Sequence, residues 1–297
     1  MDVTHLQSIT GHAGGIFDVI STRNKEFAYT SSADKYIVKW NLKTGKQEKF
    51  AIRLIHSCFR ILLTQDENLM VVGNAKGGLH FIDLAKKVEL RNIEQHKAAI
   101  FALTLNPHAK EVYAGDADGG FSVWDSTTMD YKLMLPFNCG KIRDIAIEPN
   151  GAHIALCCQD GQIRVLETKF FNEVVSFKAH NNGANCAVFK GDQLITGGKD
   201  AYISVWDWKN KRLITKVPAH NFAVYDLKLL HDSNKLVSAS FDKTIKLWDV
   251  TKGIELIERK EAKNGGHKHT VNRLEKLDEF TFLSVSDDRH LMHWRLD

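Results

Sequence analysis

Short runs of apolar residues alternate with clusters of Asp, Asn, Ser and Gly along the whole chain of 297 residues. The segment 219–250 shows the unit most clearly: three apolar-rich runs are separated by a turn at 231–234 and by a tight turn that contains Asp242, and the third run ends at Trp248. Asp, Asn and Ser favour turns because their side chains hydrogen-bond to nearby backbone groups. The pattern therefore predicts β-strands joined by short turns.

This unit recurs at a period of 40 to 46 residues. The position of Trp248 is filled seven times, at Trp40, Ile82, Trp124, Leu166, Trp206, Trp248 and Trp294. An acid lies six positions earlier in all copies but the second, which has Lys76: Asp34, Asp118, Asp160, Asp200, Asp242 and Asp288. Seven copies at this period indicate a repeat architecture, in which each unit packs on its neighbours.

Four copies, numbered one, five, six and seven in chain order, carry the same set of His, Ser or Thr, Asp and Trp. The sets are His12, Thr30, Asp34 and Trp40; His180, Thr196, Asp200 and Trp206; His220, Ser238, Asp242 and Trp248; and His267, Ser284, Asp288 and Trp294. With this period and these repeated residues, the chain resembles the WD40 repeat family over essentially its whole length. The resemblance implies an all-β fold, a seven-bladed β-propeller of four-stranded antiparallel blades.

The resemblance also implies that each set forms a hydrogen-bonded network inside its blade. Blade three keeps His96, Asp118 and Trp124 but has Ala114 at the hydroxyl position, so we expect an incomplete network there. Blade two has apolar residues at three of the four positions and Lys76 at the last. Replacing all partners by apolar groups can be nearly neutral, so we expect blade two to have no network and Lys76 to point to solvent.

The two ends of the chain complement each other. The last repeat stops at its third strand, which contains Trp294, and Val3–Ile9 forms one additional strand before the first repeat. The resemblance implies that this N-terminal strand completes the last blade and closes the ring, which removes an open sheet edge. We therefore expect one domain over residues 1–297 with almost no helix.

Composition narrows the function classes. The net charge is only +4 and the signs are mixed, so no basic stripe favours nucleic acid as a partner. No apolar run approaches the roughly 18 residues of a membrane helix, and the start of the chain does not resemble a secretory signal. The five cysteines contain no CxxC motif, which favours buried free thiols in a reducing compartment. We expect a cytoplasmic protein, with the nucleus as the alternative.

The first strand of each repeat carries two apolar columns, four and seven residues after the His position. An odd separation places them on opposite faces of a regular strand, or on one face if a bulge lies between them. The residues between them are Phe17, Phe59, Phe101, Arg143, Asn185, Tyr225 and Asn272 in one column, and Asp18, Arg60, Ala102, Asp144, Cys186, Asp226 and Arg273 in the next. In the family this region lines the mouth of the central channel.

These columns, on the face with the Gly-His turns (the top face), suggest a binding site. We expect Phe17, Phe59, Phe101, Tyr225 and Phe241 to form stacking walls, Asp18, Asp144 and Asp226 to accept a cationic side chain, and Arg143 to contribute to the mouth. Rings at a mouth can equally well fill the channel.

We therefore expect a non-catalytic scaffold, monomeric and without cofactor or metal, that binds a protein or peptide on its top face. The alternatives are RNA binding through the same face, where aromatic side chains would stack on bases, and an enzyme with its active site in the channel mouth. The Ser/His/Asp sets alone do not indicate a hydrolase, because they recur in four blades with the hydroxyl on a strand.

Overall fold

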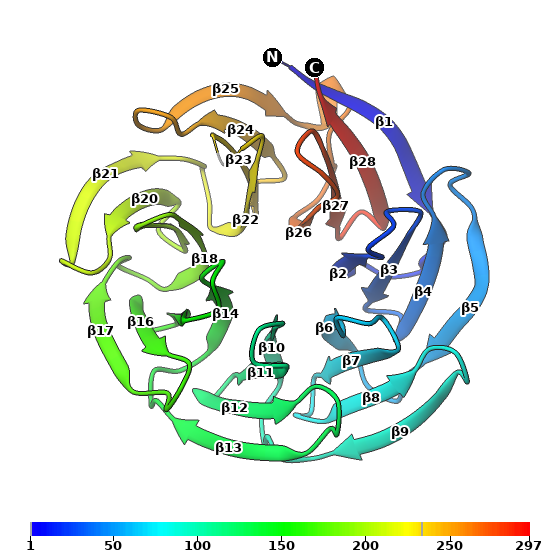
Figure 1. The fold of residues 1–297 in the computed structure, drawn as a ribbon. Coiled ribbons are helices and arrows are strands. Elements are labelled where there is room, and N and C mark those ends of the chain that lie inside the picture. The colour runs from blue at the N-terminus through cyan, green and yellow to red at the C-terminus, as the bar shows by residue number, and fades with distance from the viewer. Residues whose placement is uncertain (1, 233) are drawn as a thin grey trace.

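Seven twisted sheets stand around a common axis in the computed structural model, which describes residues 2–232 and 234–297 (Figure 1). Every sheet has four antiparallel strands. The predicted seven-bladed propeller is confirmed. The one helix in the described part of the chain is η1 (Ala262–Asn264), a single 3₁₀ turn in the insertion before blade seven.

The blades share one plan, with strands following one another from the axis to the rim. Blades one to four are β2 (Ile16–Ser21), β3 (Phe27–Ser32), β4 (Tyr36–Asn41), β5 (Gln47–Arg53); β6 (Cys58–Leu63), β7 (Leu69–Asn74), β8 (Leu79–Asp83), β9 (Val88–Ile93); β10 (Ile100–Asn106), β11 (Glu111–Asp116), β12 (Gly120–Asp125), β13 (Tyr131–Pro136); and β14 (Ile142–Ile147), β15 (His153–Cys158), β16 (Gln162–Glu167), β17 (Glu173–Lys178). Blades five to seven are β18 (Ala184–Lys190), β19 (Gln193–Gly198), β20 (Tyr202–Asp207), β21 (Arg212–Pro218); β22 (Val224–Leu230), β23 (Lys235–Ser240), β24 (Ile245–Asp249), β25 (Glu255–Lys260); and β26 (Val271–Lys276), β27 (Thr281–Ser286), β28 (His290–Leu296), β1 (Val3–Thr10).

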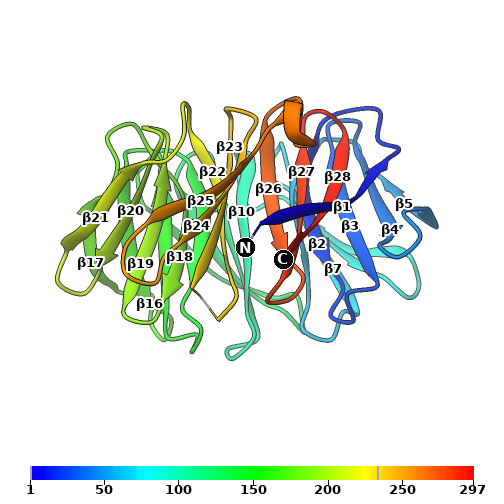
Figure 2. The same ribbon diagram turned by 90° about the horizontal axis from the view of Figure 1, so that it is seen from above.

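The N-terminal strand β1 closes the ring, as predicted. It pairs antiparallel with β28 from Val3 opposite Leu296 to Thr10 opposite His290, and the two strands lie side by side in Figure 1 and Figure 2. The backbones of Asp2 and Asp297 exchange two hydrogen bonds of 3.2 and 3.0 Å. Blade seven therefore has its outer strand, and β28 has no free edge.

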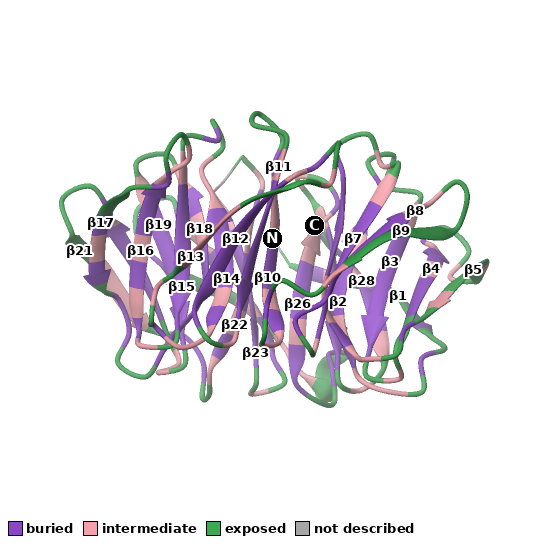
Figure 3. Cartoon of the chain, turned by 90° about the horizontal axis from the view of Figure 1, so that it is seen from below, coloured by how far each residue is buried: buried purple, intermediate pink, exposed green. Residues whose placement is uncertain are grey.

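The core lies between neighbouring sheets, where the second strand of each blade is buried on both faces, as are most residues of third strands such as β12 (Figure 3). Between blades two and three, for example, Phe81 packs beside Trp124, with ring centroids 6.2 Å apart, and Ile100 and Val71 join the same cluster. This double burial explains the continuous apolar runs in the sequence. All five cysteines are buried and free, as expected.

The four predicted networks are present. In blade six the imidazole of His220 bonds through Nδ1 to Asp242 (3.0 Å) and through Nε2 to the hydroxyl of Ser238 (2.7 Å), which accepts the indole N–H of Trp248 (2.9 Å). Blades one, five and seven repeat this chain of contacts. Within each network the imidazole, the hydroxyl, the carboxylate and the indole N–H all have a partner, as a buried network requires.

Blade three corrects the prediction of an incomplete network. His96 bonds to Asp116 (2.7 Å), not to Asp118, and its other nitrogen lies 2.7 Å from the hydroxyl of Ser122. The same hydroxyl accepts the indole N–H of Trp124 at 2.7 Å. The network is therefore complete, with its acid moved two residues earlier and its hydroxyl moved to the third strand.

Blade two also differs from the prediction of wholesale apolar replacement. His80 and Asn74 hydrogen-bond through their side chains at 2.8 Å, and the side-chain amide oxygen Oδ1 of Asn74 accepts hydrogen bonds from the backbone N–H groups of Lys76 and Gly78. A different polar pair thus holds this turn. The side chain of Lys76 is exposed, as expected.

A β-bulge interrupts the inner strand of every blade and decides between the two arrangements of the apolar columns. The register shifts between Ile16 and Asp18 in β2, and at the corresponding place in β6, β10, β14, β18, β22 and β26. The bulge places both apolar columns on one face. The residue at each bulge is thereby free to turn toward the channel mouth.

Candidate binding site at the channel mouth

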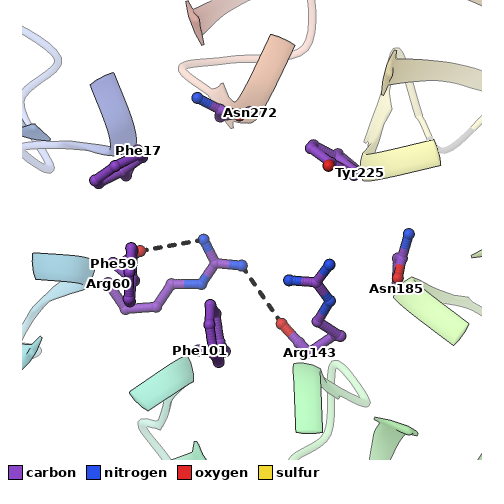
Figure 4. A pocket seen from close by; sticks show the side chains of 8 residues that line it. All are labelled: Phe17, Phe59, Arg60, Phe101, Arg143, Asn185, Tyr225 and Asn272. Carbon is purple, nitrogen blue, oxygen red and sulfur yellow. Dashed lines mark hydrogen bonds between the residues drawn. The ribbon is translucent and has the colours of Figure 1, made fainter. Parts of the chain in front are cut away.

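Bulge residues from all seven inner strands meet in one pocket at the mouth (Figure 4). The cavity has a volume of about 120 Å³ and is lined by Phe17, Phe59, Arg60, Phe101, Arg143, Asn185, Tyr225 and Asn272. Five of these residues were predicted as site residues. Phe241 was predicted too, but it lies beside the pocket and not in its lining.

Three phenylalanines form a continuous wall along blades one to three. The ring of Phe59 lies between those of Phe17 and Phe101, with centroid separations of 5.1 and 4.9 Å, and it is nearly parallel to Phe101 at 11°. Offset or tilted rings at such distances attract one another through their quadrupoles. The wall is therefore stabilised by its own contacts, and each ring remains partly exposed.

A second aromatic group stands on blade six. Tyr225 lies 6.0 Å from Phe241 between ring centroids, and Phe241 lies 5.8 Å from Phe222. Phe222 and Phe241 are 59% and 47% exposed, and their rings lie in contact with each other, so they form one apolar surface beside the pocket. Sequence reasoning missed Phe222. Its signal is its place two residues after His220, where the other repeats have Gly, Ala, Asn or His.

Two arginines supply the charge of the pocket. The guanidinium of Arg143 lies 5.4 Å from the centre of the Phe101 ring, which also has the ammonium of Lys141 at 4.8 Å. Arg60 reaches across the pocket floor, where its Nη atoms donate to the carbonyl oxygens of Phe59 (3.4 Å) and Arg143 (3.5 Å), as Figure 4 shows. Burial and the nearby Arg273 lower the pKa of Arg60, because both disfavour its charge.

The three predicted acids lie in a buried layer beneath the pocket, together with Arg273. Arg273 is within 3.6 Å of Asp18, 3.2 Å of Asp144 and 3.4 Å of Asp226. Burial alone would lower the pKa of Arg273, but the three carboxylates outweigh it and raise that pKa above its usual range. Arg273 likewise lowers the pKa of Asp144 against the effect of burial.

Two of these acids also join neighbouring blades. Asp18 accepts the backbone N–H of Ile61 from the next inner strand, and Asp226 accepts that of Leu274, both at 2.8 Å. The expectation that the three acids bind a partner's cation stays a prediction. In the structure they have an internal cation already, and burial raises the pKa of Asp18 despite Arg60 and Arg273.

No group of three or more His, Cys, Asp or Glu side chains is placed to hold a metal ion among residues 2–232 and 234–297. Within the same residues, none of the helical structure is long and apolar enough to cross a membrane. The hydroxyls of the four networks are fully buried and bonded to both His and Trp. They therefore have no free approach for a substrate.

The comparisons with known proteins agree with the repeat pattern. The sequence profile described as WD domain, G-beta repeat matches residues 3–41, 87–125, 171–207 and 211–249, which make up just over half of the chain.

Several curated proteins are similar to the chain. Pre-mRNA-processing factor 17 of Homo sapiens is 24% identical over 256 residues, which are 82% of this chain and 44% of the human protein. WD repeat-containing protein 55 of Rattus norvegicus is 25% identical over 236 residues, or 78% of this chain and 62% of the rat protein. The protein of that name from Arabidopsis thaliana is 24% identical over 229 residues, or 76% and 65%. The chain thus spans 44–65% of the length of these relatives.

Proposed function

The chain belongs to the WD40 family, and from this premise we propose that it is a non-catalytic scaffold that binds a protein or peptide segment on its top face, centred on the channel mouth. One observation carries the proposal: seven bulges, one per blade, direct residues that differ between repeats into a single pocket. Function belongs to the particular site that a fold carries and not to the fold itself, so the residues of this pocket are the ones that can give a shared scaffold its own partner.

The size and lining of the pocket support a side chain as its occupant. Small-molecule sites usually measure about 300–1,000 Å³, whereas this cavity has about 120 Å³. Aromatic residues and arginine are the residue types that dominate binding energy at protein interfaces. A partner segment that lies across the top face and inserts one side chain fits both features.

The proposal includes a single domain over residues 1–297, a monomer, no cofactor, and an intracellular, cytoplasmic location. The name of the human relative connects it with pre-mRNA processing. RNA on the same face is therefore the second candidate ligand. The cations beside Phe101 favour it, because a base could stack on the ring while Lys141 and Arg143 contact its phosphate.

Selection from a random displayed peptide library tests the first candidate. Peptides selected on the wild-type protein are measured for affinity against the double variant Phe59→Ala, Phe101→Ala. We expect at least a tenfold loss of affinity, equivalent to about 1.4 kcal/mol, with little change in melting temperature. The matched control is Phe170→Ala, Phe280→Ala, which removes two exposed rings that do not line the pocket and should leave affinity unchanged.

The outcomes separate the candidates. Unchanged affinity in the mouth variant, or failure of that variant to fold, means that the rings only fill the channel. Tyr225→Ala, which removes a ring outside the stacked wall, provides a second mouth variant with less risk to the fold. Binding of an oligoribonucleotide in place of peptides, with affinity that falls steeply with salt, would support the RNA candidate.

A further inference from the structure

The pocket at the mouth is cationic, although acids are abundant in the layer below it. Its eight lining residues include Arg60 and Arg143 and no Asp or Glu. Asp18, Asp144 and Asp226 are at most 7% exposed, and all three are within ion-pair distance of Arg273. A group that enters the pocket from the top face therefore meets the arginines first.

Arg60 has hydrogen-bonding capacity left over. A guanidinium has five N–H donors, and here two of its nitrogens make only long bonds of 3.4 and 3.5 Å to backbone carbonyls. Its Nε is buried and has no hydrogen-bond partner within the described part of the chain. Its distance to Asp18 is 3.9 Å, whereas Arg273 lies closer to the same acid. The arginine at the floor is thus weakly satisfied.

Arg143 adds a second cation from the wall. Its guanidinium lies near the face of Phe101, and it makes no ion pair with an acid of residues 2–232 or 234–297. In Figure 4 the side chains of Arg60 and Arg143 both extend into the pocket, from blades two and four. Arginine binds planar oxyanions well because its N–H groups form a rigid fork.

We propose that the mouth pocket receives the carboxylate of an Asp or Glu side chain from a peptide partner, held by Arg60 and Arg143, while an apolar neighbour of that residue packs on Phe222 and Phe241. This proposal rests on the proposed function and names the chemistry of the partner. It reverses the charge expected from the sequence, where the acids below the pocket were taken as the contact groups.

The charges around the pocket favour a carboxylate over a phosphate. Three carboxylates lie directly beneath it, and Asp287 stands exposed at the rim, where it accepts a hydrogen bond of 2.7 Å from Asn272. The four acids balance the four cations Arg60, Arg143, Lys141 and Arg273, so the site has no excess positive charge for a phosphate group, which carries about −1.5 to −2 charges at neutral pH. A carboxylate, with a single charge, fits this balance better. Because Asp287 repels an anion from its own side of the rim, the side of the pocket near Arg143 is the favoured position for the carboxylate.

The apolar contact follows from the aromatic group on blade six. Tyr225 lines the pocket and touches Phe241, which in turn touches Phe222, so the exposed rings continue from the pocket across the top of this blade. A peptide with its acid in the pocket would place an adjacent side chain over these rings. Burial of their exposed surface would add hydrophobic stabilisation to the charged contact.

Capped synthetic peptides with a fixed central residue test the proposal. One set has Glu, Asp, Gln, Lys or phosphoserine at the centre, each flanked by Leu or by Ser in an otherwise random background, and affinity is measured by fluorescence anisotropy. We expect Glu or Asp flanked by Leu to bind at least tenfold more tightly than Gln, Lys or phosphoserine. Arg143→Gln should remove the preference for Glu over Gln, and Arg143→Glu should make Lys the preferred residue.

The controls distinguish this proposal from the one it rests on. Lys76→Gln removes an exposed cation of the top face that does not line the pocket and should leave the preference intact. If peptides bind through Phe59 and Phe101 but show no preference for an acid, the scaffold function stands and the carboxylate proposal is wrong. Tighter binding of Lys or of phosphoserine also overturns it. If no peptide of any set binds, both proposals fail.

Discussion

Ala114 and Ser122 lie directly opposite each other on β11 and β12, and the hydroxyl that the repeat lacks at Ala114 is supplied by Ser122. Side chains of directly opposed residues stand on the same side of an antiparallel sheet. A hydroxyl on either strand can therefore reach both the imidazole and the indole of the blade. The network needs a hydroxyl at this point in space, not at one point in the sequence.

This relationship predicts that the position of the hydroxyl can be exchanged. Ser122→Ala should destabilise the protein by about 1–3 kcal/mol for each buried group that it leaves without a partner, here His96 and Trp124. The double variant Ala114→Ser, Ser122→Ala should recover most of that loss, as measured by chemical denaturation. Equal instability of the single and double variants would contradict the exchange.

Blade five offers a natural comparison. Thr196 makes the network contacts there, and the buried hydroxyl of Ser204, directly opposite, has no hydrogen-bond partner in the described part of the chain. In blade one the residue opposite Thr30 is Val38. We expect Thr196→Ala to cost at least about 1 kcal/mol less than Thr30→Ala, because Ser204 can replace the lost hydroxyl. Equal losses of unfolding free energy would show that Ser204 cannot take this role.

Ring closure by β1 predicts unequal costs for two apolar residues of one strand. Ile9 is 2% exposed and packs in the core, whereas Leu6 is 41% exposed. Ile9→Ala should cost about 2–5 kcal/mol, and Leu6→Ala about 0.5 kcal/mol or less. Both are measured by thermal and chemical denaturation.

Deletion of residues 1–9 is the stronger form of this test. Met1 lies outside the described residues, but the rest of the segment supplies nearly all of β1. The deletion exposes β28 and should cost more than the roughly 0.5–3 kcal/mol of an ordinary substitution. A truncated protein that melts within a degree or two of the full chain would disprove closure by this strand.

The network histidines of blades six and seven should be neutral at neutral pH. Burial lowers the pKa of His220 and His267, although their aspartates oppose this, and hydrogen bonds to the histidines help to lower the pKa of Asp242 and Asp288. One state satisfies both directions: an ionised Asp that accepts from Nδ1–H, and an Nε2 that accepts from the hydroxyl.

This assignment fixes the sign of the pH effect. The unfolded chain binds a proton at each of these histidines near pH 6.5, before the folded chain does, so their contribution to stability is present above that pH and is lost as the pH falls. Burial raises the pKa of Asp18 and Glu275, which act in the opposite direction. The measurement is therefore site-specific: NMR titration of the two imidazoles should give pKa values below 6.5, and values at or above it would contradict the neutral form.

The repeat pattern was sufficient to predict the blades and their closure, because each blade is specified locally by its own turns and apolar runs. The acid of blade three could not be found by counting from Trp124, since Asp116 replaces Asp118 as the partner of His96. The hydroxyl of blade three, in contrast, can be found from the hydrogen bonds that the network requires. His96 and Trp124 need a hydroxyl in place of the one missing at Ala114, and Ser122 is the only Ser or Thr of β12.

The mouth was predictable in part for a different reason. The repeat pattern was enough to identify the sequence position that holds Phe59 and its counterparts in the other blades. The pairing of the buried acids and arginines beneath these residues depends instead on contacts across the propeller axis. Arg273 in blade seven reaches Asp144 in blade four, and these residues are 129 positions apart in sequence. No local pattern indicates which of several acids and bases will pair at such a distance.

The two arginines of the axis should respond differently to removal of their charge. Arg273→Met leaves Asp18, Asp144 and Asp226 without their nearest cation in a buried layer, which should cost about 3–5 kcal/mol, as is usual when one member of a buried ion group is removed. Arg60→Met removes a cation whose nearest acid is 3.9 Å away and whose own pKa is lowered by burial and by Arg273. We expect it to cost clearly less than the roughly 3–5 kcal/mol of Arg273→Met, because it removes only one distant ion pair and leaves Arg273 beside all three acids.

Chemical denaturation of both variants measures this difference in stability, and peptide binding shows whether Arg60 contacts a ligand. If Arg273 is the internal partner of the acids and Arg60 is available for a ligand, Arg273→Met loses stability, whereas Arg60→Met keeps its fold and loses affinity for Glu-containing peptides. Equal destabilisation by the two substitutions would show that Arg60 is a structural member of the same buried ion group. In that case Arg143 alone would have to hold a carboxylate, and Arg60→Met would no longer report on binding.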